Sequence, residues 1–246
     1  EIGYPVLQRG SGGVSLTEAG EALMPHVERI LRDSRALEQA IADHRPEERH
    51  ILRIGSYTSI SRNWLPQVLK GFGTEFPDVE LTVKDGSCMD IEQWLMEGTI
   101  DVGLLSNCFS APLEFLPLLQ DRYYAVLPPE EKPGETFDIS AFNGRTFFVP
   151  SNGVDTEVLR ILERSGVTPR FSLIATEDSA VIKMVEQGLG CSLLSELILR
   201  GSTDHVSLVP VDPPAFREVG AAVRSLKKVG PVLRSFLHYI RRDAEK

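Results

Sequence analysis

From residue 51 onward, short apolar runs alternate with longer segments whose apolar residues recur at helical spacing. Strands that alternate with amphipathic helices build a parallel sheet with helices on its faces. The predicted strands of the first unit are residues 51–56, 79–83 and 100–105, and its predicted helices are residues 64–76 and 90–98. In the second of these helices Asp90 is the expected N-cap.

A second, similar unit follows. Its predicted strands are residues 145–149, 170–174 and 191–194, and its predicted helices are residues 155–165 and 178–187. Further strands are predicted before this unit at residues 116–119 and 123–127 and after it at residues 205–211 and 219–224, and Pro231 opens a final helix. This order predicts an α/β fold of two Rossmann-like lobes joined by crossing strands.

The first 50 residues follow a different pattern. A small hairpin is expected before residue 16, and Thr17 is placed to cap a helix. Apolar residues then step by three and four along one helical face, which indicates a dimerisation seam. The seam residues are Leu23, Val27, Ile30, Leu37 and Ile41, interrupted by Ser34. The alternative is a helix packed on its own domain, but little else in this region can cover it. Residues 45–50 are an expected linker.

Charge and cysteine content narrow the function. The net charge of −9 argues against a nucleic-acid clamp in these residues, because phosphate affinity comes mainly from clustered Lys and Arg. Three cysteines, Cys88, Cys108 and Cys191, share no CxxC spacing, so neither a disulfide framework nor a zinc site is expected. No apolar run approaches the roughly 20 residues of a membrane span, and no export signal is visible. We therefore expect a soluble cytoplasmic protein.

Small polar residues follow the predicted strands. In open α/β sheets, ligands bind outside the carboxyl ends of strands, where helix N-termini favour anions. The loops at these ends are residues 56–59, 86–87, 106–107, 150–153 and 176–177, and hydroxyl and amide side chains dominate them. Such residues also cap helices and turns very often. Their convergence on one cleft favours a ligand site.

Several segments in this order resemble LysR-type transcription regulators. Gln8-Arg9 precedes a Leu16-Thr17-Glu18-Ala19-Gly20 element similar to the start of that family's linker helix. The further similar segments are residues 52–55, 76–81, the Leu95, Gly98 and Asp101 pattern, and Gly188-Leu189-Gly190 before Leu193-Leu194. Glu1-Ile2-Gly3 resembles the end of a recognition helix and the turn after it. The resemblance covers almost the whole chain.

The resemblance implies a domain plan and a set of partners. Residues 1–16 would be the remnant of a winged helix-turn-helix, 17–50 a linker and dimerisation helix with its hinge, and 51–246 a periplasmic-binding-protein-like effector domain. Lobe I would hold residues 51–122 and 211–246, and lobe II residues 123–210. The implied partners are a small-molecule effector, promoter DNA through a DNA-binding domain largely outside these residues, a second chain in a homodimer or homotetramer, and RNA polymerase as a further candidate.

The expected effector-binding residues are Thr58, Ser59, Ser87, Ser106, Ser151, Asn152 and Thr176. We expect no cofactor and no metal. A small carboxylate is the expected effector class, although acidic residues surround these positions and Arg62 is the only nearby cation in the sequence.

Three other hypotheses share parts of this pattern. An enzyme would need a base or metal ligand in the cleft, yet the five histidines fall on the linker helix, the linker, late strands and the last helix. Asp101 is expected to tie a strand start to its turn rather than to catalyse. An exported solute-binding protein has the same two lobes but no use for a heptad seam. A redox-sensing regulator would use Cys88 or Cys108 as a reactive thiol.

Overall fold

The structure is a computed structural model and describes residues 2–10, 13–42, 50–149, 156–172, 177–201 and 205–244. The strands are β1 (Leu7–Gly10), β2 (Gly13–Leu16), β3 (His50–Ser56), β4 (Val79–Asp85), β5 (Val102–Ser106), β6 (Glu114–Leu127), β7 (Phe137–Asp138), β8 (Thr146–Phe148), β9 (Arg170–Ser172), β10 (Ser192–Ser195), β11 (Ser207–Asp212) and β12 (Phe216–Val223). The helices are α1 (Glu18–Ala42), α2 (Thr58–Asn63), α3 (Leu65–Glu75), α4 (Cys88–Glu97), α5 (Thr156–Arg164), α6 (Asp178–Glu186), α7 (Glu196–Leu199) and α8 (Pro231–Ala244), with short 3-10 turns at η1 (Ile139–Phe142) and η2 (Leu226–Lys228).

The N-terminal hairpin leads directly into the long helix α1. Strands β1 and β2 pair antiparallel, as the glycine-rich turn predicts. The Thr17 hydroxyl accepts a hydrogen bond from the Gly20 amide at 3.1 Å, which confirms Thr17 as the cap of α1.

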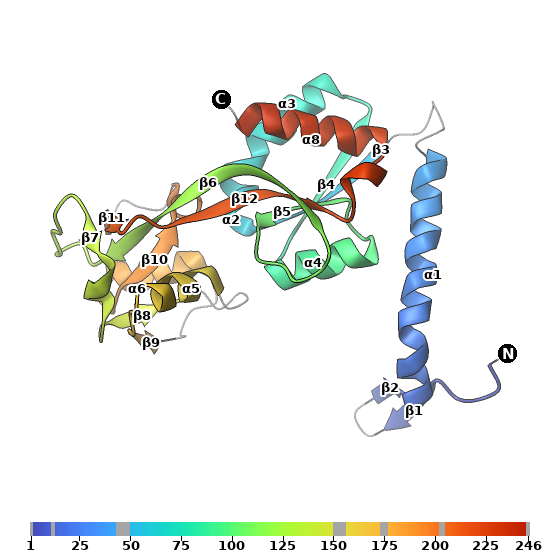
Figure 1. The fold of residues 1–246 in the computed structure, drawn as a ribbon, viewed down its shortest axis with the longest axis horizontal. Coiled ribbons are helices and arrows are strands. Elements are labelled where there is room, and N and C mark those ends of the chain that lie inside the picture. Colours follow the sequence, from blue (N-terminus) through green and yellow to red (C-terminus); the bar gives the residue numbers. More distant parts are fainter. Residues whose placement is uncertain are drawn as a thin grey trace.

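Lobe I consists of β3, β4 and β5 with α2, α3, α4 and α8 (Figure 1). The central strand β3 pairs in parallel with both β4 and β5, and β12 continues the sheet antiparallel to β5. Alternation along β5 fills both faces: Val102 and Leu104 join the core under α3 and α8, whereas Leu105 joins the core under α4. Helices therefore cover the sheet on both sides.

Strands β6 and β12 cross from lobe I into lobe II and pair antiparallel with each other (Figure 1). Lobe II holds β7 to β11 with α5 and α6, and its strands β10 and β11 lie on either side of the second half of β6. Here too alternate residues separate two cores, with Ala125 facing the cluster under α5 and Val126 the cluster under α6. The α/β fold and the joining strands match the prediction.

Two local predictions are wrong. Residues 116–119 and 123–127 are not separate strands but parts of β6, because β12 pairs with residues 114–122 across a register shift at Val219, and β10 and β11 pair with the residues that follow. The helix predicted over residues 64–76 is present as α3, whereas the short helix α2 before it was not predicted. The N-cap of α4 is Ser87, and Asp90 lies at the third helical position. The lobe boundaries near residues 122 and 211 stay predictions.

Candidate effector site

The carboxyl ends of β3, β4 and β5 meet at one edge of the lobe I sheet, because these strands are parallel. Backbone hydrogen bonds hold the loops that follow them side by side. The Tyr57 amide donates to the Leu104 carbonyl at 3.1 Å, and the Gly86 amide donates to the Ser56 carbonyl at 3.1 Å. The predicted convergence of these loops is therefore present in the structure.

Ser87 lies at this edge as the N-cap of α4. Its hydroxyl accepts from the Asp90 amide at 3.2 Å and donates to the Asp90 carboxylate at 2.6 Å, while the Ser87 amide donates to the same carboxylate at 2.9 Å. These hydrogen bonds hold the pKa of Asp90 below its ordinary value. Ser87 thus has a capping role, which is the common role of serine at such a position.

Ser59 lies on α2 beside a buried ion pair. Its hydroxyl oxygen accepts a hydrogen bond from Arg217 Nη2 at 3.1 Å. Arg217 lies on β12 and binds the Asp121 carboxylate on β6 through Nε and Nη2, each at 2.8 Å. The Tyr57 ring centroid is 5.9 Å from the Arg217 guanidinium carbon. A guanidinium group whose charge is balanced by the Asp121 carboxylate therefore lies next to one of the predicted effector residues.

Ser106 lies at the end of β5 and contacts the other lobe. Its side chain is fully buried, and its hydroxyl donates to Glu157 Oε2 at 2.8 Å. The Tyr57 hydroxyl oxygen is 3.4 Å from the Ser106 hydroxyl oxygen. Glu157 is in the first turn of α5, so this hydrogen bond joins lobe I to lobe II. A polar group of each lobe meets at the place where an effector is expected.

The other predicted effector residues are Thr58 in lobe I and Ser151, Asn152 and Thr176 in lobe II. Thr58 is exposed at the first position of α2. Ser151, Asn152 and Thr176 lie outside the described residues. The structure therefore brings Ser59, Ser87 and Ser106 to one edge, and the assignment of all seven as effector contacts stays a prediction.

Comparison with known proteins identifies the family that has this architecture. The family model described as the LysR substrate binding domain matches residues 45–245. This chain belongs to the LysR family. Among curated relatives, the LysR chain is 25% identical over 238 residues to the uncharacterized HTH-type transcriptional regulator YvbU of Bacillus subtilis, an alignment that covers 94% of this chain and 80% of YvbU.

Solved structures agree on the fold. The LysR chain superposes on a full-length mutant of BenM with a TM-score of 0.74 and 20% identity, covering 100% of this chain and 84% of that one. It superposes on the regulatory domain of CcmR from Synechocystis PCC6803, solved in complex with 2-PG, with a TM-score of 0.73 and 20% identity, covering 80% and 98%. The family model and the curated relatives support a LysR-type transcription regulator over an exported solute-binding protein.

One expectation about the cysteines of this LysR chain is wrong. Cys88 and Cys108 form a disulfide, although their separation of 20 residues matches no spacing motif. The fold brings them together because Cys88 begins α4 and Cys108 follows β5, next to which α4 packs. Cys191 is buried, and burial raises its pKa to about 11.

The charge at the site also differs from expectation. Arg62 is exposed in the last turn of α2, and the cation that contacts a predicted effector residue is instead Arg217, more than 150 positions away in the sequence from Ser59. Glu157 was likewise missed. The sequence pattern placed Glu157 on the predicted helix 155–165 and left Arg217 just before the predicted strand 219–224, but it gave no sign that either residue lies beside a predicted effector residue.

The predicted dimerisation seam lies along α1. The side chains of Val27, Ile30 and Leu37 are 45%, 68% and 62% exposed, whereas Leu23 is half-buried. The side chain of Ile41 lies outside the described residues. Exposed apolar residues at heptad spacing are typical of a helix that pairs with another helix.

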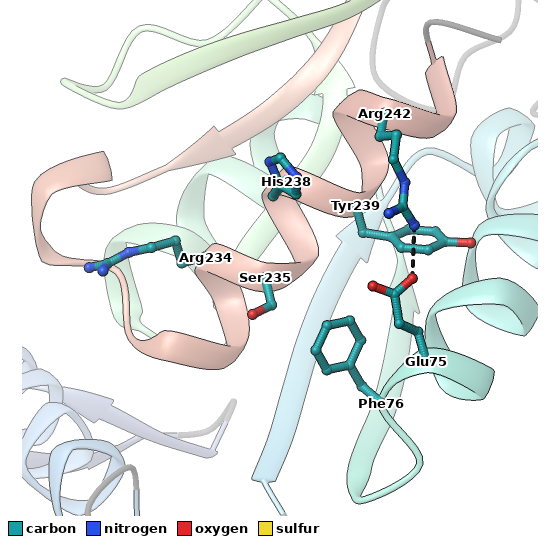
Figure 2. A pocket seen from close by; sticks show the side chains of 7 residues that line it. All are labelled: Glu75, Phe76, Arg234, Ser235, His238, Tyr239 and Arg242. Carbon is teal, nitrogen blue, oxygen red and sulfur yellow. Dashed lines mark hydrogen bonds and ion pairs between the residues drawn. The ribbon is translucent and has the colours of Figure 1, made fainter.

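A hollow with a volume of about 410 Å³ lies on lobe I between the end of α3 and α8, away from the predicted effector residues (Figure 2). Its lining residues are Glu75, Phe76, Arg234, Ser235, His238, Tyr239 and Arg242. Arg242 pairs with Glu75 at 2.8 Å, and its guanidinium carbon lies 5.0 Å from the Tyr239 ring centroid. This hollow contains none of the predicted effector residues and serves as the competing location for a ligand.

Within the described ranges, no group of three or more His, Cys, Asp and Glu side chains is arranged to hold a metal ion. In the same part of the chain, no helix has the length and apolar character needed to cross a bilayer.

Proposed function

We propose that this LysR-family chain binds a small molecule in the cleft between its lobes and that this binding alters how the regulator binds or activates its promoter. A ligand that binds one arrangement of the lobes better than another shifts their equilibrium by its differential affinity. The effector would contact Ser59 and Ser106 in lobe I together with Ser151, Asn152 and Thr176 in lobe II, with Thr58 and Ser87 at the rim.

The observation that carries this proposal is the hydrogen bond from Ser106 to Glu157. It joins a fully buried hydroxyl of lobe I to a carboxylate of lobe II. A polar contact between two separately packed cores is sensitive to their relative position, because hydrogen bonds weaken steeply with distance and angle. A small molecule that offers its own acceptor to Ser106 would replace Glu157 and change how the lobes meet.

The hinge of the proposed motion lies where β6 and β12 cross. Asp121 accepts from the Leu197 amide at 3.0 Å as well as from Arg217, and Asn63 donates to the Leu197 carbonyl at 2.7 Å. Leu197 is on α7, and its side chain packs into the lobe I core. These contacts tie α2, α7 and both crossing strands together, so Ser59 is linked through Arg217 to the hinge.

The proposed regulator acts in the cytoplasm on promoter DNA. The chain would pair through α1 into a homodimer or homotetramer. Its contact with DNA would come from the winged helix-turn-helix of which residues 1–16 would be the remnant. RNA polymerase is a further proposed partner. The 2-PG complex of the CcmR regulatory domain supports a ligand site in a domain of this fold.

The effector class is a small carboxylate in this proposal. Arg217 and the Ser59 hydroxyl supply the favourable groups, and a carboxylate would take over the hydrogen bond that Ser106 now donates to Glu157. The negative charge of Glu157 itself opposes an anion at this place. A ligand screen therefore needs acids, neutral compounds and amines of similar size.

The experiment is a thermal-shift screen repeated on two matched variants. Ser106→Ala removes a hydroxyl in the cleft, and Ser235→Ala removes one in the hollow between α3 and α8. We expect compounds that raise Tm of the wild type and of Ser235→Ala but raise Tm of Ser106→Ala much less. A shift lost only in Ser235→Ala would place the ligand in the other hollow and contradict the proposal.

We further infer that the chain has no enzymatic activity. In the described part of the chain, His26 lies on α1 and His238 on α8, away from the strand ends that form the cleft. The matching check is to incubate the protein with a bound compound and recover that compound by mass spectrometry. We expect it unchanged, and a product that forms only with the intact cleft would refute this inference.

A further inference from the structure

We propose that Cys88 and Cys108 form a reversible dithiol–disulfide site at the rim of the cleft. The chemistry of this site is independent of the proposed effector function. Its consequence for an effector rests on that function, and the two are tested separately below.

The disulfide lies between two loops that carry predicted effector residues. Cys88 follows Ser87 as the first residue of α4. Cys108 is two residues beyond Ser106, and its amide donates to the Ser106 carbonyl at 2.8 Å. The bond thus joins the loops after β4 and β5 across a Cα–Cα distance of 6.7 Å. A change in its state acts directly at the proposed ligand site.

The surroundings of this pair differ from those of the third cysteine. Cys88 and Cys108 are partly exposed, whereas Cys191 is buried and has a pKa raised to about 11. A thiolate at Cys88 would lie at the N-terminus of α4, which favours negative charge. The Tyr57 hydroxyl lies 2.9 Å from Cys108 Sγ and can donate to a sulfur that carries charge. The pair therefore has solvent access, together with a helix N-terminus and a hydroxyl group beside its sulfur atoms, whereas burial dominates the pKa of Cys191.

The proposed reactants are a peroxide and a dithiol. In the oxidising direction, one thiolate attacks the peroxide ROOH, which breaks the O–O bond and gives a sulfenic acid and ROH after one proton is taken up. The second thiol then attacks this sulfur, and water leaves as the disulfide forms. In the reducing direction, a dithiol attacks the disulfide through a mixed disulfide and leaves as its own disulfide, which returns two thiols.

Reduction would release only part of the second loop. The Glu92 carboxylate on α4 still accepts from the amides of Ser110 and Ala111, at 3.2 and 2.8 Å. The segment between Ser106 and Ser110 would gain freedom, together with the Tyr57 hydroxyl that contacts both Ser106 and Cys108. If the proposed function holds, the redox state of the pair then sets how firmly Ser106 is held for an effector.

The chemical test is differential alkylation of the folded full chain, followed by peptide mass spectrometry. After dithiothreitol, we expect Cys88 and Cys108 to react with iodoacetamide at least about tenfold faster than Cys191. After one equivalent of hydrogen peroxide, we expect a linked Cys88–Cys108 peptide that dithiothreitol removes again. Two outcomes would each overturn the proposal: a bond that native protein does not yield to dithiothreitol, or thiols that peroxide does not rejoin.

The structural consequence is tested by hydrogen exchange. Reduction should increase amide exchange in residues 106–109 and leave β10 unchanged. The Cys88→Ser, Cys108→Ser double variant should behave like reduced protein in either redox state, whereas the matched Cys191→Ser variant should respond like the wild type. Equal exchange in both redox states of the wild type would overturn the switch. A cleft ligand that binds equally well in both redox states would contradict the coupling of the pair to Ser106 and leave the proposed function standing.

Discussion

Arg217 and Asp121 form a buried ion pair at the proposed hinge. The side chains of Arg217 and Asp121 are 5% and 1% exposed, and each has further hydrogen bonds to other elements. Removing one member of a buried pair leaves the other charge without compensation, which costs more than the pair contributes when intact.

We therefore predict that Arg217→Met lowers the free energy of unfolding by about 3–5 kcal/mol. The double variant Asp121→Leu, Arg217→Met should recover much of this loss, because no isolated charge remains. Urea denaturation of the three proteins measures both effects. A single variant that costs less than about 1 kcal/mol, as exposed pairs do, would show that this pair is not buried in solution.

The Ser87–Asp90 capping box gives a pH-dependent prediction. Ser87→Ala should cost about 1 kcal/mol near neutral pH, because the cap of α4 is lost. The pKa of Asp90 is lowered in the folded state, so its contribution is present above its ordinary value of 3.8 and is lost as pH falls through the folded-state pKa. The difference between variant and wild type in urea denaturation should shrink below about pH 4. A difference that stays constant down to pH 3 would contradict this assignment.

Single residues could be predicted from sequence where their partners are local or follow from strand order. Thr17 caps α1 as expected. Asp101 lies just before β5, and its carboxylate accepts from the Arg53 amide of the neighbouring strand β3 at 2.8 Å, so this hydrogen bond joins two strands, whereas a tie between a strand start and its turn was expected. Glu157, Arg217 and the Cys88–Cys108 disulfide were not predicted, because their partners come from elements whose relative placement a periodic pattern does not contain.

Packing between elements depends on two glycines of the lobe I sheet. A Cβ at Gly103 on β5 would lie 2.5 Å from Ile91 Cγ2 and 3.1 Å from Leu95 Cδ1, both on α4. Gly103 therefore lets α4 approach the strand that carries Ser106. A Cβ at Gly55 on β3 would similarly lie 2.5 Å from Ile100 Cδ1.

We predict that Gly103→Ala lowers the free energy of unfolding by about 1–3 kcal/mol through overpacking. The matched control is Gly134→Ala, since a Cβ at Gly134 meets nothing within 4 Å, and it should change stability by less than about 0.5 kcal/mol. Chemical denaturation of both variants checks the pair. Similar stability of the two would mean that α4 does not pack on β5 as described.

Among the helices and strands, the sequence predicts the buried strands well, but it does not predict how far a strand continues or where short helices lie. Strands β3, β4 and β5 lie close to their predicted positions, because each has a period-two or fully apolar pattern. The continuity of β6 was missed because the polar residues Gln120, Asp121 and Arg122 interrupt its middle, where pairing with β12 nonetheless holds the backbone extended. The helix α7 was missed because four residues show no period.

We predict that the assembly of the whole molecule depends on the exposed apolar residues of α1. We predict that Val27→Asp, Ile30→Asp converts the dimer or tetramer to a monomer, because charges at seam positions would have to be buried. The control variant Glu28→Lys changes an exposed neighbour on the same turn and should keep the oligomer. Sedimentation velocity distinguishes these states. A wild type that is monomeric at tens of micromolar would refute pairing through α1.

The two-lobed fold and its family could be predicted from the order of motifs over almost the whole chain. The effector could not, because hydroxyl and amide side chains around a cleft specify hydrogen bonds and leave shape and charge open. The structure adds Arg217 beside Ser59 and Glu157 beside Ser106. A ligand must therefore accept the hydrogen bond that Ser106 now donates to the Glu157 carboxylate.

The most direct test of the central claim is a crystal structure of the chain with a compound from the thermal-shift screen. We predict that the compound lies between the lobes, accepts a hydrogen bond from Ser106 and separates that hydroxyl from Glu157. A compound bound between α3 and α8, with the Ser106–Glu157 hydrogen bond intact, would contradict the claim that this cleft is the effector site.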